Sequence, residues 1–267
     1  MEEKVLSKSK NGMAVLLGII AGMIICVGLF IVSVASENPF TGAISVILFI
    51  ILCILPAGLK VLKPQEALVL TLFGKYVGTL KDDGFYFVNP FCVAVNPAAK
   101  TKLSQSGDVN KPSTSVFLQS GTRAETEMVS RKISLKMMTL NNAVQKINDC
   151  LGNPVEIGIA VIWKVNDTYK AVFNVDNYKE YLSLQCDAAL RNVVRVYPYD
   201  VAQNVDTTGD GQADDGSLRG SSEIVAKRIR DEIQSKVELA GIEIIEARIT
   251  YLAYAPEIAS VMLQRQQ

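Results

Sequence analysis

The side chains best spaced to bind an ion lie in an acidic stretch that also contains glycine. Asp206, Thr208 and Asp210 supply oxygen atoms at alternate positions, and a glycine follows them. This spacing is typical of the start of a calcium loop, which takes oxygens at positions one, three and five and glycine at six. Asp214 adds a carboxylate, but the twelfth position holds Ser217 where such loops carry a bidentate glutamate. We therefore predict no bound metal, with Asp206, Thr208, Asp210 and Asp214 as a weak candidate cation loop and a solvated acidic connector as the favoured interpretation.

The sequence lacks the residues that most often carry out catalysis. It contains no histidine, which removes the commonest general base, the Ser-His and Cys-His nucleophile pairs and the commonest metal ligand. The motifs GxSxG, GxxxxGK[ST] and a strand followed by GxGxxG are also absent. An enzyme built on carboxylates such as Glu243 and Glu246 is an alternative, but salt bridging with Arg248 is the better interpretation of these residues. We predict that the protein is not an enzyme and has no catalytic residues and no cofactor.

Charge and cysteine content restrict the partners and the compartment. Lys and Arg total 27, and Asp and Glu also total 27, so no overall field attracts nucleic acid, which is excluded as a partner. The five cysteines form no CxxC pair. Free thiols in a reducing compartment fit this pattern best.

Two apolar segments, 13–35 and 40–59, contain no charged side chain. A helix rises about 1.5 Å per residue and a bilayer core is about 30 Å thick, so each segment is long enough to span a membrane. Only residues 36–39 separate them, and we predict that residues 1–60 form a transmembrane helical hairpin. Two alternatives remain open: a signal peptide cleaved after Ala35 followed by one span, and a shallow re-entrant hairpin.

Charges that flank the two segments predict the orientation of the hairpin. Lysines precede the first segment and follow the second, whereas the connecting loop carries only Glu37. Lys and Arg accumulate on the cytoplasmic side. We therefore expect a cell-membrane protein with two spans and a cytoplasmic soluble part.

After residue 60 the pattern changes to short strands and then to helices. Residues 67–73, 85–88 and 129–137 are typical of strands, and residues 143–148 with 155–165 predict a hairpin whose second strand alternates strictly, with Trp163 in the core. Helical patterns follow at 167–173, with Asp167 as the expected N-cap, and from Asp176, a second expected cap, to about 196. A third runs from about 221, repeats apolar residues every four positions from Val225 to Val237, and ends at Gly241.

A last strand at 242–253 places Ile245 and Ala247 on one face, and Pro256 suits the first turn of a final helix. We predict an α+β fold. The expected organisation is an antiparallel β-rich subdomain at 61–166, an α/β subdomain at 167–255 and the start of a C-terminal helix at 256–267.

Several spaced pieces resemble the stomatin/prohibitin/flotillin (SPFH, or band 7) family, in the bacterial form with two N-terminal spans. The similar pieces are residues 61–69, 73–79, 83–91, 148–157 with Trp163, 188–191, 197–200, 240–243 and 253–258. The resemblance covers roughly residues 61–267, and it is specific because the pieces occur in the family's order. Two features depart from the family pattern: the polar stretch 104–127 is less regular, and the sequence ends where members continue into a long charged coiled coil.

The resemblance implies a membrane-anchored, non-enzymatic scaffold that self-assembles into a large ring or cage and organises a membrane microdomain and its clients. Its expected partners are further copies of the chain, membrane lipids and a client such as a membrane-bound AAA protease. A one-to-one membrane-tethered regulator of a protease or channel is the alternative. Residues expected near the bilayer are candidates for lipid contact, although core burial is the more common state of such aromatic side chains. They are Phe85, Tyr86, Phe87 and Phe91.

Overall fold

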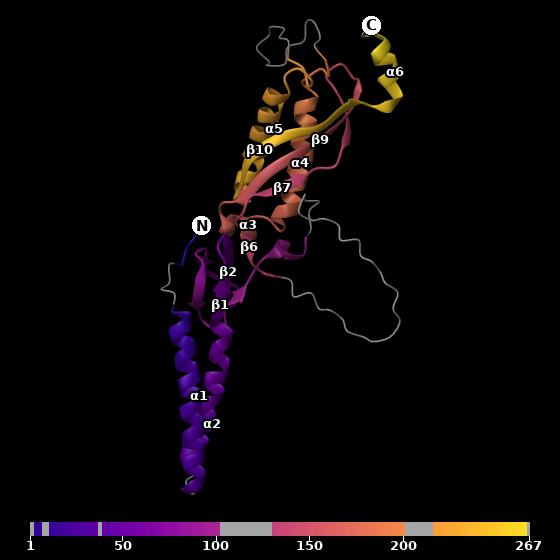
Figure 1. Cartoon of the computed structure of the whole chain (residues 1–267). Helices are drawn as coiled ribbons and strands as arrows, with labels where there is room; N and C mark the ends of the chain where they lie inside the picture. Colours follow the sequence, from indigo (N-terminus) through magenta and orange to yellow (C-terminus); the bar gives the residue numbers. More distant parts are fainter. Residues whose placement is uncertain (1–2, 7–10, 37–38, 102–129, 201–215, 266–267) are drawn as a thin grey trace, which may run out of the picture. The chain divides into compact units, whose positions relative to one another are not determined.

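A computed structural model describes residues 3–6, 11–36, 39–101, 130–200 and 216–265 of the chain (Figure 1). The chain forms two compact units. The first comprises Met1–Asn96 with Ser130–Leu135, and the second comprises Pro97–Val129 with Lys136–Gln267. The mixture of helices and antiparallel sheets confirms the predicted α+β fold class.

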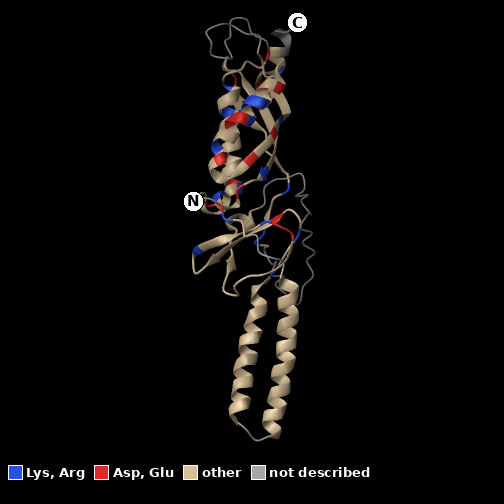
Figure 2. Cartoon of the chain, turned by 90° about the vertical axis from the view of Figure 1, so that its left-hand side faces the viewer, with Lys and Arg blue, Asp and Glu red and all other residues tan. Residues whose placement is uncertain are grey.

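Two helices dominate the start of the first unit. Helix α1 (Gly12–Ala35) and helix α2 (Pro39–Ile54), which continues into the 3-10 turn η1 (Leu55–Gly58), lie side by side. The spans Gly12–Ala35 and Pro39–Gly58 are long and apolar enough to cross a membrane. Neither helix carries a charged side chain, in contrast to the strands and helices that follow (Figure 2). The predicted apolar segments 13–35 and 40–59 therefore agree with the observed helices.

Short antiparallel strands complete the first unit. One sheet pairs β1 (Leu59–Leu62) with β4 (Gly84–Phe87), and a second has the order β3-β2-β5, with β6 pairing β2. These strands are β2 (Glu66–Leu72), β3 (Lys75–Leu80), β5 (Val93–Ala94) and β6 (Ile133–Ser134). A small core cluster between them contains Leu62, Leu68, Leu70, Leu80, Tyr86, Val88 and Cys92.

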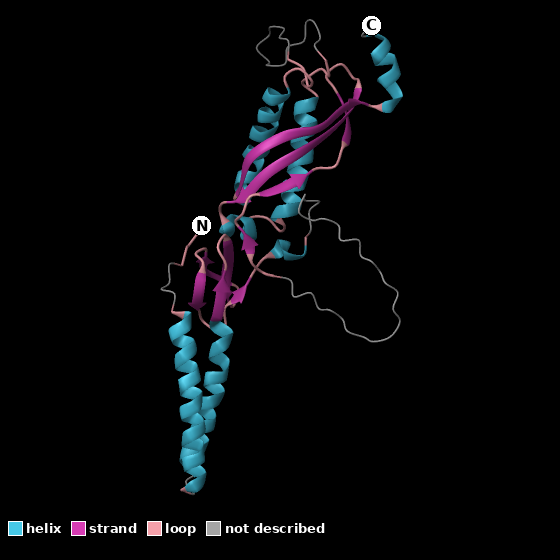
Figure 3. Cartoon of the chain, viewed as in Figure 1, coloured by secondary structure: helices cyan, strands magenta, loops and turns pink. Residues whose placement is uncertain are grey.

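The second unit is a four-stranded antiparallel sheet with helices packed against it (Figure 3). The long strands β9 (Pro154–Val165) and β10 (Ile242–Tyr254) pair along most of their lengths, and β7 (Met138–Asn141) and β8 (Gln145–Asn148) pair β9 on its other side. The helices are α3 (Thr168–Phe173), α4 (Tyr178–Val194), α5 (Ser222–Val237) and α6 (Pro256–Arg265), with 3-10 turns η2 (Pro97–Lys100) and η3 (Glu238–Ala240). Alternate residues of β9, from Val155 to Val165, are buried as predicted.

The core of the second unit is continuous. Trp163 is fully buried and meets Tyr178 of α4 edge to face, with ring centroids 6.3 Å apart. Burial raises the pKa of the Tyr178 hydroxyl to about 12. Helix α5 contributes the predicted four-residue repeat, from Val225 to Val237, and all of its members are fully buried. Sheet and helices thus form one apolar layer.

Helix ends follow the expected chemistry with one change. Asp167 caps α3 by accepting a hydrogen bond from the Lys170 amide, as predicted. We predicted Asp176 as the cap of α4, but the neighbouring Asn177 accepts the amide hydrogen bonds of its first turn. Gly241 ends the second long helical segment in a left-handed conformation, with φ of 65°.

Two strand predictions need correction. The stretch 129–137 was expected to be one strand, but only Ile133–Ser134 pairs β2, and the chain then enters the second unit, where β7 pairs β9. In β10 a register shift between Ile244 and Glu246 moves Ile245 away from the core face. Ile245 is therefore 38 % exposed, whereas Ile244 and Ala247 are buried.

The second unit combines strands with helices. Strands β7, β8 and β9 belong with the helices of the second unit. The physical reason is the pairing of β9 with β10, because two long strands joined by a ladder and a shared core pack as one unit.

Candidate membrane-contact site

Both ends of the helical hairpin contact β4 or the residue after it, and a glycine lies at each contact. A Cβ atom added to Gly12, at the start of α1, would lie 2.7 Å from Cγ of Phe85. One added to Gly58, at the end of the second span, would overlap the carbonyl oxygen of Val88. The Val88 amide donates a hydrogen bond to the Gly58 carbonyl oxygen at 2.9 Å. Residues 84–88 are therefore held directly against the end of the hairpin that joins the strands.

An exposed aromatic pair lies close to this contact along the chain. Phe91 follows Val88 in a turn, in which Asn89 accepts hydrogen bonds from the amides of Phe91 and Cys92. The ring of Phe91 stacks on that of Phe73, with centroids 6.4 Å apart and planes at 24°. Phe73 is 88 % exposed and Phe91 is 59 % exposed.

The position of Phe73 follows from the turn between β2 and β3. Phe73 and Gly74 both adopt positive φ, at 49° and 83°. This turn reverses the chain and leaves the Phe73 side chain outside the sheet. A non-glycine residue with positive φ is uncommon, and here it holds a large apolar side chain in an exposed turn.

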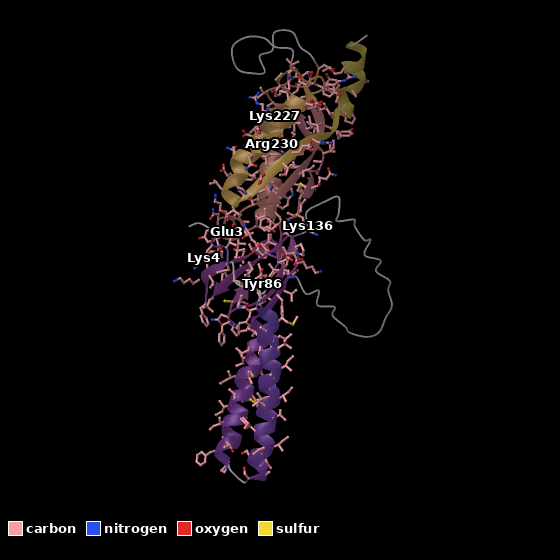
Figure 4. All side chains as sticks on the ribbon, turned by 60° about the vertical axis from the view of Figure 1, so that its left-hand side comes forward. Glu3, Lys4, Tyr86, Lys136, Lys227 and Arg230 are labelled. Carbon is pink, nitrogen blue, oxygen red and sulfur yellow. The ribbon has the colours of Figure 1, made fainter. Side chains whose placement is uncertain are left out.

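The four predicted lipid-contact residues differ in their surroundings. Phe91 is exposed, as lipid contact requires. Tyr86 is buried in the small core, with its hydroxyl donating to the Asp82 carbonyl oxygen at 3.1 Å (Figure 4). Phe85 and Phe87 are partly buried at the two glycine contacts.

Sequence reasoning missed Phe73, which the structure pairs with Phe91. The available signal was its place directly before Gly74, where the strand pattern ends. An aromatic residue at a turn cannot reach the sheet core as easily as one within the strand. The apolar character of the strand obscured this distinction.

The remaining sequence candidates form no second site among the described residues. Asp206, Thr208, Asp210 and Asp214 lie outside the part of the chain that the structure describes. Within the described part, no group of three or more His, Cys, Asp or Glu side chains is placed to hold a metal ion.

The carboxylates proposed for an alternative enzyme are engaged in ion pairs. Glu243 pairs with Lys164 at 3.3 Å, and Glu246 pairs with Arg248 at 2.6 Å, as expected for the latter pair. Glu246 and Arg248 also line a groove between α5 and β10 that contains the labelled Lys227 and Arg230 (Figure 4). Because both basic and acidic side chains line this groove, it has no single sign of charge for a ligand to recognise.

Comparison with known proteins gives one family. The family model described as SPFH domain / Band 7 family matches residues 60–267. No curated protein matches the chain. The matched region begins within β1, after the second apolar span, and includes strands β2 to β10 and helices α3 to α6.

Proposed function

Because the chain belongs to the SPFH domain / Band 7 family, we propose that it is a membrane-anchored, non-enzymatic scaffold. Copies of the chain assemble into a ring or cage, and the assembly organises a membrane microdomain and its client proteins. A membrane-bound AAA protease is one client of suitable type. The observation that carries the proposal is the direct connection of two membrane-length apolar helices to the family domain.

A contact between the segment before the hairpin and a strand after it supports the orientation of the anchor. Residues 3–6, which precede α1, lie along β3, which follows α2. Both ends of the hairpin must then face the same side of the membrane. The lysines that flank the helices favour the cytoplasm for that side, so the SPFH domain faces the cytoplasm. The same pairing argues against a signal peptide cleaved after Ala35.

We assign the lipid-facing surface of the first unit to the stacked pair Phe73 and Phe91. Both side chains are exposed, and Phe91 lies three residues beyond the hydrogen bond between Val88 and Gly58. Aromatic rings partition into the membrane interface, where an apolar ring meets polar headgroups. The pair therefore adds a contact beside the spans without needing a further helix.

Self-assembly is tested by measuring the mass of the full-length protein in a mild detergent and in lipid nanodiscs. We expect a closed oligomer of many copies. A uniform monomer would contradict the scaffold. A fixed one-to-one complex with a membrane protease or channel would instead support the alternative regulator.

Lipid contact is tested by tryptophan quenching in vesicles that contain brominated lipids. The chain has one tryptophan, Trp163, and it is fully buried, so the wild-type protein supplies a low baseline. We expect additional quenching for Phe91→Trp and Phe73→Trp, strongest with bromine near the headgroup end of the acyl chain. If brominated lipids leave the tryptophan emission of both variants unchanged, this surface does not contact lipid. That result would not affect the scaffold proposal.

A further inference from the structure

Residues 3–6 lie along the outer edge of the sheet in the first unit and are joined to it by an isolated β-bridge. Val5 pairs in parallel with Thr79 of β3. The Thr79 amide donates to the Lys4 carbonyl oxygen at 2.9 Å, and the Leu6 amide donates to the Thr79 carbonyl oxygen at 2.9 Å. These hydrogen bonds satisfy an edge of β3 that otherwise has no strand partner among the described residues.

Side chains reinforce this backbone pairing on several sides. Glu3 accepts an ion-paired hydrogen bond from Lys81 at 2.6 Å, and both side chains are largely buried, with 12 % and 23 % exposure. The hydroxyl of Tyr76 lies 3.3 Å from the Lys4 amide, which donates to it. Leu6 packs against the small core of the unit. Figure 4 shows Glu3 and Lys4 against these strands.

The segment lies close to the backbone of β3 at Gly78. A Cβ atom added to Gly78 of β3 would lie 2.5 Å from Cγ of Leu6 and 2.9 Å from the Lys4 carbonyl oxygen. Only glycine leaves room for the segment at this distance. Gly78 also has φ of 155°, which side-chain-bearing residues rarely adopt.

We propose that residues 3–6 are a clasp that acts within one chain and fixes the strands of the first unit onto the helical hairpin. The chain leaves the second span through β1, and the contacts at Gly12 and Gly58 hold β4 and Val88 beside it. The clasp ties the segment before the first span to β3, so the hairpin holds the sheet by both of its ends. This inference rests on the membrane anchor proposed above and is independent of self-assembly.

The ion pair supplies a direct chemical test in the full-length protein. A water-soluble carbodiimide joins a carboxylate and an amine in contact as an amide, with loss of the activating group as a urea. We expect a linked peptide between Glu3 and Lys81 when membranes containing the protein are treated. Lys81→Arg keeps the charge but offers no reactive amine, so it should abolish the link and thereby identify the site.

Isotope mixing distinguishes a clasp within one chain from exchange between copies. Unlabelled and ¹⁵N-labelled copies are produced in the same membranes before coupling. We expect every linked peptide to be fully labelled or fully unlabelled. Mixed peptides would overturn the proposal, because residues 3–6 would then pair with a neighbour, and the absence of any link would overturn it as well.

Variants within the segment leave the strands themselves unaltered. Leu6→Pro removes both the amide that donates to Thr79 and the apolar side chain, and we expect the yield of the link to fall at least tenfold. We also expect faster hydrogen exchange at the Thr79 amide. Val5→Thr is the matched control, because the Val5 side chain is 48 % exposed, and it should behave as wild type.

An unchanged yield in Leu6→Pro would contradict the clasp. Failure of the membrane anchor is seen separately, as release of the wild-type protein from membranes by alkaline carbonate. The two results are therefore distinguishable, since the coupling measures contact and the wash measures insertion.

Discussion

The two units of the chain hold together by different means. The second unit buries long alternating strands under α4 and α5, and its stability comes from side chains such as Trp163 and Leu182 that are fully buried. The first unit has a core of a few residues between short strands, and it is fixed by backbone contacts at Gly12, Gly58 and Gly78. The stability of a unit with its own core does not depend on neighbouring segments. The stability of a unit fixed by close backbone contacts depends on the anchor that makes those contacts.

Removing one core side chain should give the largest effect, and only in the second unit. Leu182→Ala deletes a fully buried side chain of α4, so we expect a loss of about 3 kcal/mol in the free energy of unfolding. Chemical denaturation in detergent, followed by the fluorescence of Trp163, measures it. Leu184→Ala on the same helix is the control, because Leu184 is 64 % exposed and should cost less than about 0.5 kcal/mol.

This prediction also tests the contrast between the units. Hydrogen exchange at the Val88 amide of the first unit should stay unchanged in Leu182→Ala. Equal loosening of both units would mean that they share one cooperative transition.

A glycine replacement at the anchor should give an intermediate effect, and only in the first unit. The Cβ of Gly58→Ala overlaps the carbonyl oxygen of Val88, and the strands must shift to relieve the overlap. We expect a cost of about 1–3 kcal/mol and faster hydrogen exchange at the Val88 amide, with the Trp163 transition unchanged.

Gly18→Ala is the matched control for Gly58→Ala. A Cβ atom at Gly18 meets no atom within 4 Å, so this variant should exchange as wild type. If hydrogen exchange at the Val88 amide stays slow in Gly58→Ala, the end of the hairpin is not held against the strands.

The smallest effect concerns an ion pair that joins β2 to the residue before β6. The hydrogen bond from Lys132, 2.8 Å from Glu66, lowers the pKa of the Glu66 carboxyl below its ordinary value of 4.5. A lowered pKa in the folded state stabilises the fold above pH 4.5, and this contribution is lost as the pH falls through the lowered value. We expect at most about 1 kcal/mol, as for other surface ion pairs.

The measurement for this pair is the pH dependence of hydrogen exchange at the Leu135 amide, which donates to the Gln65 carbonyl oxygen at 2.9 Å. After correction for intrinsic exchange, protection should decline below pH 4.5 in the wild type. Glu66→Gln should remove this decline. An identical decline in the variant would assign the pH dependence to other groups.

Sequence periodicity was sufficient for local features of the second unit but not for features that depend on strand pairing. The inner face of β9, the repeat of α5 and the cap at Asp167 could all be predicted, because each depends on residues near one another in the chain. The bulge at Ile245 could not, since a register shift depends on the pairing partner. The break between β6 and β7 is of the same kind, because the two segments pair with strands of different sheets.

The candidate site was only partly predictable for a related reason. Apolar character placed Phe85, Tyr86, Phe87 and Phe91 near the bilayer, but it does not distinguish a ring in the core from a ring outside it. Tyr86 is buried because β4 pairs β1 in a register that turns its ring inward. Phe73 joins Phe91 only through tertiary contact, and no local pattern contains that information.

The pairing of residues 3–6 with β3 sets an order of events at the ribosome. Lys4 is made before both apolar helices, whereas its partner Tyr76 lies 72 positions later, beyond them. Residues 3–6 therefore remain unpaired while the translocation machinery inserts the hairpin. A bulky fusion directly before residues 3–6 would hinder their later pairing with β3, so purification tags are better placed at the other end of the chain.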